Sequence, residues 1–152
     1  GMRSGTHNVP GITGLGVAAE KIYEDHEAKI ARMYEIKKEF VKLVQELPET
    51  KINGLTDEQS APHVVSVSFA GVRSEVLLHA LEERGIYVSS GSACSSNHPA
   101  VSGTLRGIGV ERELLDSTLR FSFSIFTTEE EIRYCAQMLS ELLPVLRRYR
   151  RK

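Results

Sequence analysis

Several features that would define a class of protein are missing from this sequence. Its 152 residues contain no tryptophan and only two cysteines. Two cysteines cannot form a disulfide framework or a four-thiolate zinc site, so we expect a reducing, cytoplasmic setting. No apolar run approaches the roughly 20 residues of a membrane-spanning helix, and the first residues lack the apolar region of a signal peptide. The sequence therefore predicts a protein without a membrane partner.

Charge and histidine spacing exclude two further classes. The chain has 19 Lys and Arg residues against 20 Asp and Glu residues, a formal net charge of −1, so no global field attracts nucleic acid. The five histidines have no paired metal-ligand spacing, and the HEXXH motif is absent. We therefore expect neither a nucleic-acid partner nor a metal site.

The first third of the chain has the pattern of one long helix. Apolar residues recur at spacings of three and four, which predicts a helix from about Pro10 or Gly16 to Leu47, with Pro48 as its end. Its apolar stripe consists of Ile30, Met33, Ile36, Phe40, Val44 and Leu47.

Alternating segments in the rest of the chain predict strands. Residues 63–70 and 119–125 alternate between apolar and small or polar residues, and shorter strands are expected at 51–53 and 86–90. A helix from a Ser74 cap to Arg84 lies between two of them, with a buried side made of Val76, Leu77, Ala80 and Leu81 and a stop at Gly85.

A final helix completes the expected fold. Thr128 and Glu131 form a capping box at its start, and Pro144 should kink or end it. If the strands on either side of helix 74–84 are parallel, strand 119–125 can lie antiparallel to both. We therefore predict an α+β fold, a small, mostly antiparallel sheet with helices on one face. We divide it into residues 1–48, a Gly-rich segment with the connecting helix, and 49–152, a small domain.

The two thiols have different surroundings in the sequence. Cys94 lies among small residues in the segment SSGSACSS, which fits no regular element and leaves the thiol accessible, one requirement for reactivity. From the residues alone, a reactive Cys94 and an incidental surface thiol both stay open. Cys135 lies between Ile132 and Met138 on an amphipathic helix, where free cysteine behaves as a small hydrophobic residue.

Two other residues have the chemistry of binding groups. Arg120 points away from the apolar face of its strand between small serines, and a guanidinium binds a carboxylate through two parallel hydrogen bonds; an ordinary ion pair is the alternative. Thr6 precedes the first helix, where a hydroxyl and free backbone N–H groups can hold a phosphate.

At these residues the sequence resembles a known family. The segments, in order, are MRSGT, NVPGI, VVSVSF, SEVLLHALEERGIYVSSGSACSS, STLRFSFS and FTTEEEI, and together they span almost the whole chain. They resemble the C-terminal portion of bacterial cysteine desulfurases, which belong to the class V aminotransferase-like family of fold-type-I pyridoxal phosphate enzymes. The resemblance implies that the small C-terminal domain of such an enzyme is the fold.

The resemblance also implies roles for the candidate residues. Cys94 would take sulfur from L-cysteine as a persulfide, leaving L-alanine, and pass it to an acceptor protein for iron–sulfur cluster or thiocofactor assembly. Arg120 would bind the substrate carboxylate. Thr6 would reach the cofactor phosphate in the second subunit of a homodimer.

One part of the family pattern has no counterpart here. The Ser-x-His-Lys segment with the Schiff-base lysine is absent from the sequence. We therefore expect a domain fragment of a longer enzyme that is inactive alone. The helix stripe at 30–47 and the Gly-rich start would be exposed, so that the chain self-associates.

Two alternatives stay open. A selenocysteine lyase or another class V aminotransferase shares the family pattern, although an ordinary aminotransferase needs no thiol. A stand-alone module that accepts sulfur on Cys94 belongs to a different class.

Overall fold

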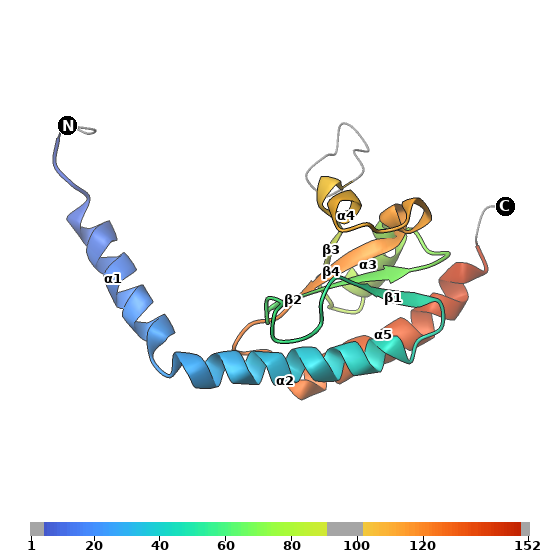
Figure 1. Ribbon diagram of the computed structural model, residues 1–152, viewed down its shortest axis with the longest axis horizontal. Helices are drawn as coiled ribbons and strands as arrows, with labels where there is room; N and C mark the ends of the chain where they lie inside the picture. Colours follow the sequence, from blue (N-terminus) through green and yellow to red (C-terminus); the bar gives the residue numbers. More distant parts are fainter. Residues whose placement is uncertain (1–4, 91–101, 150–152) are drawn as a thin grey trace.

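The computed structural model describes residues 5–90 and 102–149. Figure 1 shows helices and a small sheet joined to one helix that projects away from them. In chain order the elements are α1 (Val9–Tyr23), α2 (His26–Gln45), β1 (Thr50–Asn53), β2 (Val64–Phe69), α3 (Ser74–Glu82), β3 (Ser89–Ser90), α4 (Gly103–Gly107), the 3-10 helix η1 (Arg112–Ser117), β4 (Thr118–Ser122) and α5 (Glu129–Arg147).

The sheet confirms the predicted α+β class. Within the described residues it has four strands in the order β1-β2-β4-β3, and every neighbouring pair is antiparallel. Because β2 and β3 both pair with β4, they are parallel to each other, as expected for the strands on either side of α3. The register places Arg120 of β4 opposite Ser66 of β2 on one side and Ser89 of β3 on the other.

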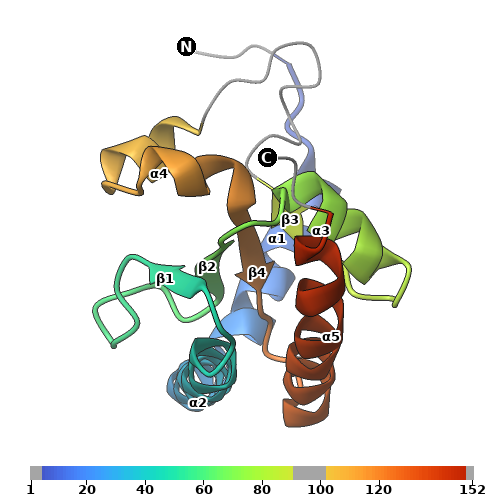
Figure 2. The ribbon, with the colours of Figure 1, turned by 90° about the vertical axis from the view of Figure 1, so that its right-hand side faces the viewer.

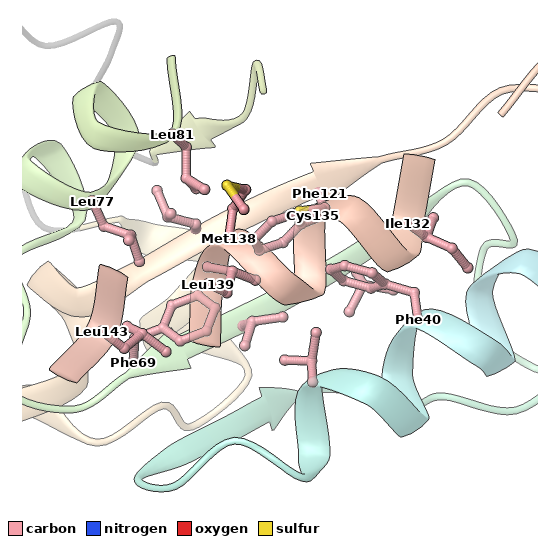
Figure 3. Close-up of a cluster of buried hydrophobic side chains, with 14 of the residues drawn as sticks. Phe40, Phe69, Leu77, Leu81, Phe121, Ile132, Cys135, Met138, Leu139 and Leu143 are labelled. Carbon is pink, nitrogen blue, oxygen red and sulfur yellow. The ribbon is translucent and has the colours of Figure 1, made fainter. Parts of the chain in front are cut away.

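Helices α2, α3 and α5 cover one face of the sheet. Figure 2 shows α2, α3 and α5 on one side and α4 on the other. Alternation explains the choice of face, because Val65, Val67 and Phe69 of β2 are buried in the core that the helices close. The Phe40 ring of α2 lies 4.9 Å from the Phe121 ring of β4, centroid to centroid. Figure 3 shows this core and the α5 side chains that complete it.

The prediction of one continuous N-terminal helix is wrong. The helix ends at Tyr23 and a second begins at His26, with Asp25 in the left-handed region at φ 54°. The Lys29 ammonium group donates to the carbonyl oxygens of Lys21 and Glu24, which the break leaves without helical partners. No residue of α1 is buried, so no packing holds the chain straight across this point.

The exposed apolar surface is also in a different place from the one expected. The stripe at 30–47 is packed in the core, where Ile36, Phe40 and Val44 are at most 1% exposed. It is α1 that presents apolar side chains to solvent: Val9, Ile12, Leu15, Val17, Ile22 and Tyr23 are 53–72% exposed. The expectation of an exposed stripe was wrong because α2 packs against α5 and the sheet.

Helix α5 differs from the prediction at its end. Its capping box is confirmed, since the Thr128 hydroxyl accepts from the Glu131 N–H and the Glu131 carboxylate accepts from the Thr128 N–H. The helix does not end at Pro144 but continues to Arg147. Arg147 donates to the carbonyl oxygens of Ala70 and Pro48 at 3.1 and 2.8 Å, and these tertiary bonds hold the last turn in place.

Two smaller differences concern α3 and the strand that follows it. Ser74 is the first helical residue, and Arg73, whose side chain makes no capping bond, is the N-cap. Val76 is 47% exposed instead of buried, whereas Leu77 and Leu81 are buried as expected. Gly85 ends the segment at φ 74°, and only Ser89–Ser90 of the expected strand pairs with β4.

Candidate functional site

The face of the sheet opposite the long helices carries the candidate site. Arg120 is exposed there, as predicted, between the small side chains of Ser66 and Ser89 in the neighbouring strands. Its Nη2 donates to the Ser89 Oγ at 3.2 Å. Among residues 5–90 and 102–149, no carboxylate lies within ion-pair distance of Arg120. Most of its five N–H donors are therefore available to an anion.

Arg120 lines a cleft with a volume of about 350 Å³. Hydroxyl groups dominate its polar lining, from Ser66, Ser89, Ser90, Ser102, Thr104 and Thr118. Val64, Leu105, Ile108 and Leu119 supply the apolar remainder of the lining, so the cleft suits a small molecule whose polar groups lie beside Arg120 and the serines. No lysine, histidine or carboxylate belongs to the part of the cleft that the structure describes.

The segment with Cys94 joins this cleft through its flanking residues. Cys94 lies outside the described residues, and so does most of the SSGSACSS segment. Ser90 and Ser102, the described residues on either side of the segment, both line the cleft. The Ser102 hydroxyl accepts from the Leu105 N–H at 3.3 Å, which starts α4 at the wall of the cleft. Both ends of the Cys94 segment therefore start from the cleft that holds Arg120.

A line of buried polar groups fixes the sheet beneath the cleft. Asn53 donates through Nδ2 to Ser68 Oγ at 2.8 Å, and the Ser68 and Thr118 hydroxyl oxygens are 2.7 Å apart. The Thr118 hydroxyl donates to the Leu114 carbonyl oxygen at 2.7 Å, so Ser68 must be the donor to Thr118. These bonds join β1, β2, β4 and η1. They hold β4 in the register that places Arg120 beside Ser66 and Ser89.

Thr6 is not brought near Arg120 within one chain. It is exposed and precedes α1, at the end of the helix that projects from the sheet (Figure 1). The nearby N-cap is Asn8, whose Oδ1 accepts from the Gly11 N–H at 3.2 Å. Thr6 and Arg120 were both candidates from the sequence, and the structure separates them, since Thr6 precedes α1 and Arg120 belongs to β4 in the sheet.

The residues of one chain do not fit a complete pyridoxal phosphate site. Among the described residues, the cleft offers a guanidinium and hydroxyls but no amine for a Schiff base, and Thr6 is not part of its lining. The described residues also contain no group of three potential metal ligands and no helix able to cross a membrane.

Cys135 has the environment predicted for a structural thiol. It is 7% exposed in the core cluster, and burial raises the pKa of its thiol to about 12. A thiol with this pKa stays protonated at neutral pH, so it is a poor nucleophile. The prediction that Cys135 belongs to the core is confirmed.

The sequence analysis did not single out Ser89. Its position beside Arg120 depends on the pairing of β3 with β4, which joins residues 31 positions apart. The only local signal was its place just before the Cys94 segment, and that signal does not distinguish it from the serines around it.

Comparison with known proteins agrees with these features. The aminotransferase class-V family model matches residues 1–135. Cysteine desulfurase IscS from Anaeromyxobacter dehalogenans is 40% identical over 148 residues, and IscS from Pseudomonas fluorescens is 42% identical over 147 residues. Each match covers 97% of this chain and 36% of the relative, so the chain spans about a third of the length of these curated relatives.

A solved structure gives the same relationship at the level of the fold. A NifS-like protein superposes with a TM-score of 0.79 at 32% identity, over 96% of this chain and 36% of that one. The family model matches well over half of the chain. The chain therefore belongs to the aminotransferase class-V family.

Proposed function

We propose that this chain supplies the sulfur-accepting thiol and the carboxylate-binding group of a cysteine desulfurase, which converts L-cysteine to L-alanine. The main supporting observation is the position of Arg120. Its guanidinium bonds to Ser89 and has no ion pair among the described residues, and it lines a cleft that Ser90 and Ser102, on either side of the Cys94 segment, also line. The names of the relatives support the same activity.

Each residue would contribute a distinct part of the reaction. Arg120 would bind the α-carboxylate of L-cysteine through two parallel hydrogen bonds, while Ser89 keeps one guanidinium nitrogen against the sheet. A substrate held in this way has its side chain free to meet a thiol on the neighbouring segment. The Cys94 thiolate would attack the substrate sulfur, and the bond between that sulfur and the substrate Cβ would break as the S–S bond forms. The electron pair of the broken bond and a proton would leave Cβ as the methyl group of L-alanine, and the persulfide on Cys94 would be delivered to an acceptor protein.

The cofactor would be held mainly by groups outside this chain. Pyridoxal phosphate is the cofactor of the proposed enzyme, and its Schiff-base lysine has no candidate in the cleft. The position of Thr6, just before the projecting helix α1, supports a contact with the cofactor phosphate in the second subunit of a homodimer. The proposed enzyme is cytoplasmic. In it, residues 1–48 would form the Gly-rich segment and the connecting helix, and residues 49–152 would form the small domain.

A chimera tests the proposal. In it, this chain replaces the matching segment of the Pseudomonas fluorescens IscS protein. We expect the chimera to release alanine from L-cysteine, and Cys94→Ser to abolish sulfur transfer. Arg120→Ala should raise the KM for L-cysteine about tenfold or more, since a charged hydrogen bond contributes roughly 1.5–3 kcal/mol. Arg106→Ala is the matched control, because Arg106 is an exposed arginine on α4 that does not line the cleft.

The other outcomes identify the alternatives. Turnover of selenocysteine without turnover of cysteine would identify a selenocysteine lyase, and activity independent of Cys94 would identify an ordinary aminotransferase. We expect the 152-residue chain alone to release no alanine, even with added pyridoxal phosphate. If the chain alone gains one sulfur from a persulfide donor, measured by mass, and Cys94→Ser does not, the sulfur-accepting role of Cys94 is supported directly.

A further inference from the structure

A groove lies between α2 and the loop at residues 56–59, apart from the Arg120 cleft. Its volume is about 1120 Å³, and it is lined from one side by α2 and from the other by the loop. The loop follows β1, and β1 packs beside α2. None of the residues named for the proposed function lines this groove.

The loop wall of the groove is fixed by side chains from α2. The Tyr34 hydroxyl lies 3.0 Å from the carbonyl oxygen of Glu58 and 2.9 Å from that of Ser60. The Lys37 ammonium group donates to the Ser60 hydroxyl at 2.6 Å and to the Ala61 carbonyl oxygen at 2.8 Å. The groove therefore exists before any ligand arrives, which lowers the cost of binding.

Lys37 explains why this wall holds its shape. It is only 2% exposed, and burial lowers the pKa of its ammonium group. A buried amine needs hydrogen-bond acceptors, and the loop supplies them. Within the loop, Asp57 accepts through Oδ1 from the Gln59 N–H at 3.0 Å, which closes the turn. Hydrogen bonds thus join the loop to α2 and close a turn within the loop.

The groove combines apolar side chains with an acidic border. Ile30, Ala31, Tyr34 and Val41 supply its apolar part. The charged residues that line it are Glu27, Glu35, Asp57, Glu58 and Lys38, a net charge of −3 in a chain whose total is −1. Glu35 pairs with Arg32 at 3.2 Å, whereas Glu27 and Glu58 have no ion pair among the described residues.

We propose that this groove docks a basic segment of a partner protein, in which lysine or arginine side chains flank an apolar one. The apolar part would bury the central side chain, and the carboxylates would meet the flanking cations. A second copy of this chain fits the groove less well. In a two-fold dimer formed through it, the acidic border would face itself, and like charges would repel.

Binding of a synthetic peptide tests the proposal on the full 152-residue chain. The probe is a short fluorescent peptide with leucines at spacings of three and four and lysines elsewhere. We measure its affinity by anisotropy at low and high salt. The groove variant is Glu27→Lys/Glu58→Lys. The matched control is Glu83→Lys/Glu113→Lys, which makes the same change of net charge at exposed carboxylates outside the groove.

We expect the groove variant to bind the peptide about tenfold more weakly or worse, and the control variant less than twofold more weakly. High salt should lower the affinity of the wild type for the peptide, because salt screens the attraction between charges. Equal losses of affinity in both variants would mean that the peptide responds to the overall charge of the chain and not to the groove, which would overturn the proposal. Unchanged binding in the groove variant, or equal binding of a peptide with glutamate in place of lysine, would also overturn it. A change of oligomeric state confined to the groove variant, seen by light scattering, would show that a second copy is the occupant. Circular dichroism checks folding, and Glu27→Gln/Glu58→Gln repeats the test with a milder change.

Discussion

The buried thiol of Cys135 predicts a specific loss of stability at alkaline pH. In the folded chain burial raises its pKa to about 12, from an ordinary value of 9.0. Between these values the unfolded chain has lost the thiol proton and the folded chain still holds it. Because the folded state binds more protons, its stability falls as the pH rises through this interval. Each pH unit corresponds to about 1.4 kcal/mol, so raising the pH from 8 to 11 should remove roughly 2–3 kcal/mol.

Urea unfolding at pH 8 and pH 11 measures this loss. Cys135→Ala serves as the reference, because alanine keeps a small apolar side chain and has no proton to lose. All other ionisable groups are present in both proteins, so their contributions cancel in the comparison. The wild type should lose roughly 2–3 kcal/mol more than Cys135→Ala between the two pH values. Equal losses in the two proteins would refute the assignment of this thiol to the core.

Three further predictions follow from the packing. Thr128→Ala should lower the free energy of unfolding by about 1 kcal/mol in urea titrations, because it removes the hydroxyl of the capping box; an unchanged midpoint would contradict this. Phe40→Ala should cost about 3–5 kcal/mol by the same measurement, because Phe40 is 1% exposed between α5 and the sheet; a loss below 1 kcal/mol would show that its surroundings are not packed. The wild-type chain should self-associate in light scattering through α1, and Ile12→Asp/Leu15→Asp should yield a monomer, since these side chains are 59% and 72% exposed; a concentration-independent monomer in the wild type would contradict this.

Periodic segments of the sequence gave correct local predictions. In β4, Leu119 and Phe121 are buried and Arg120 is exposed, because alternation of two residues per repeat determines the face. The capping box at Thr128 was correct for a similar reason, since its hydrogen bonds join residues three apart. Such features depend on neighbours in the sequence.

The errors arose where distant contacts decide the structure. The burial of Lys37 could not be predicted, because Ser60 and Ala61 supply its acceptors from a loop 23 and 24 residues away. Helix α5 continues past Pro144 because Arg147 bonds to carbonyl groups near residues 48 and 70. The break at Asp25 follows from the opposite situation, since no tertiary packing supports α1. The pairing of Arg120 with Ser89 could not be predicted, because the register of strands far apart in sequence is not a local property.

The strand order β1-β2-β4-β3 has a consequence for how this chain folds during synthesis. The central strand β4 is the last of the four to leave the ribosome, so β2 and β3 have no common partner until residue 122 has been made. Strand β1 can pair with β2 early, but β3 must remain unpaired while more than 30 residues are added after it, which places the costly loop closure late. The insertion of β4 then completes the sheet and puts Arg120 between its two serines in a single event. A chain that stops before β4 could form only the β1–β2 part of this sheet and would lack Arg120 and the cleft that it lines.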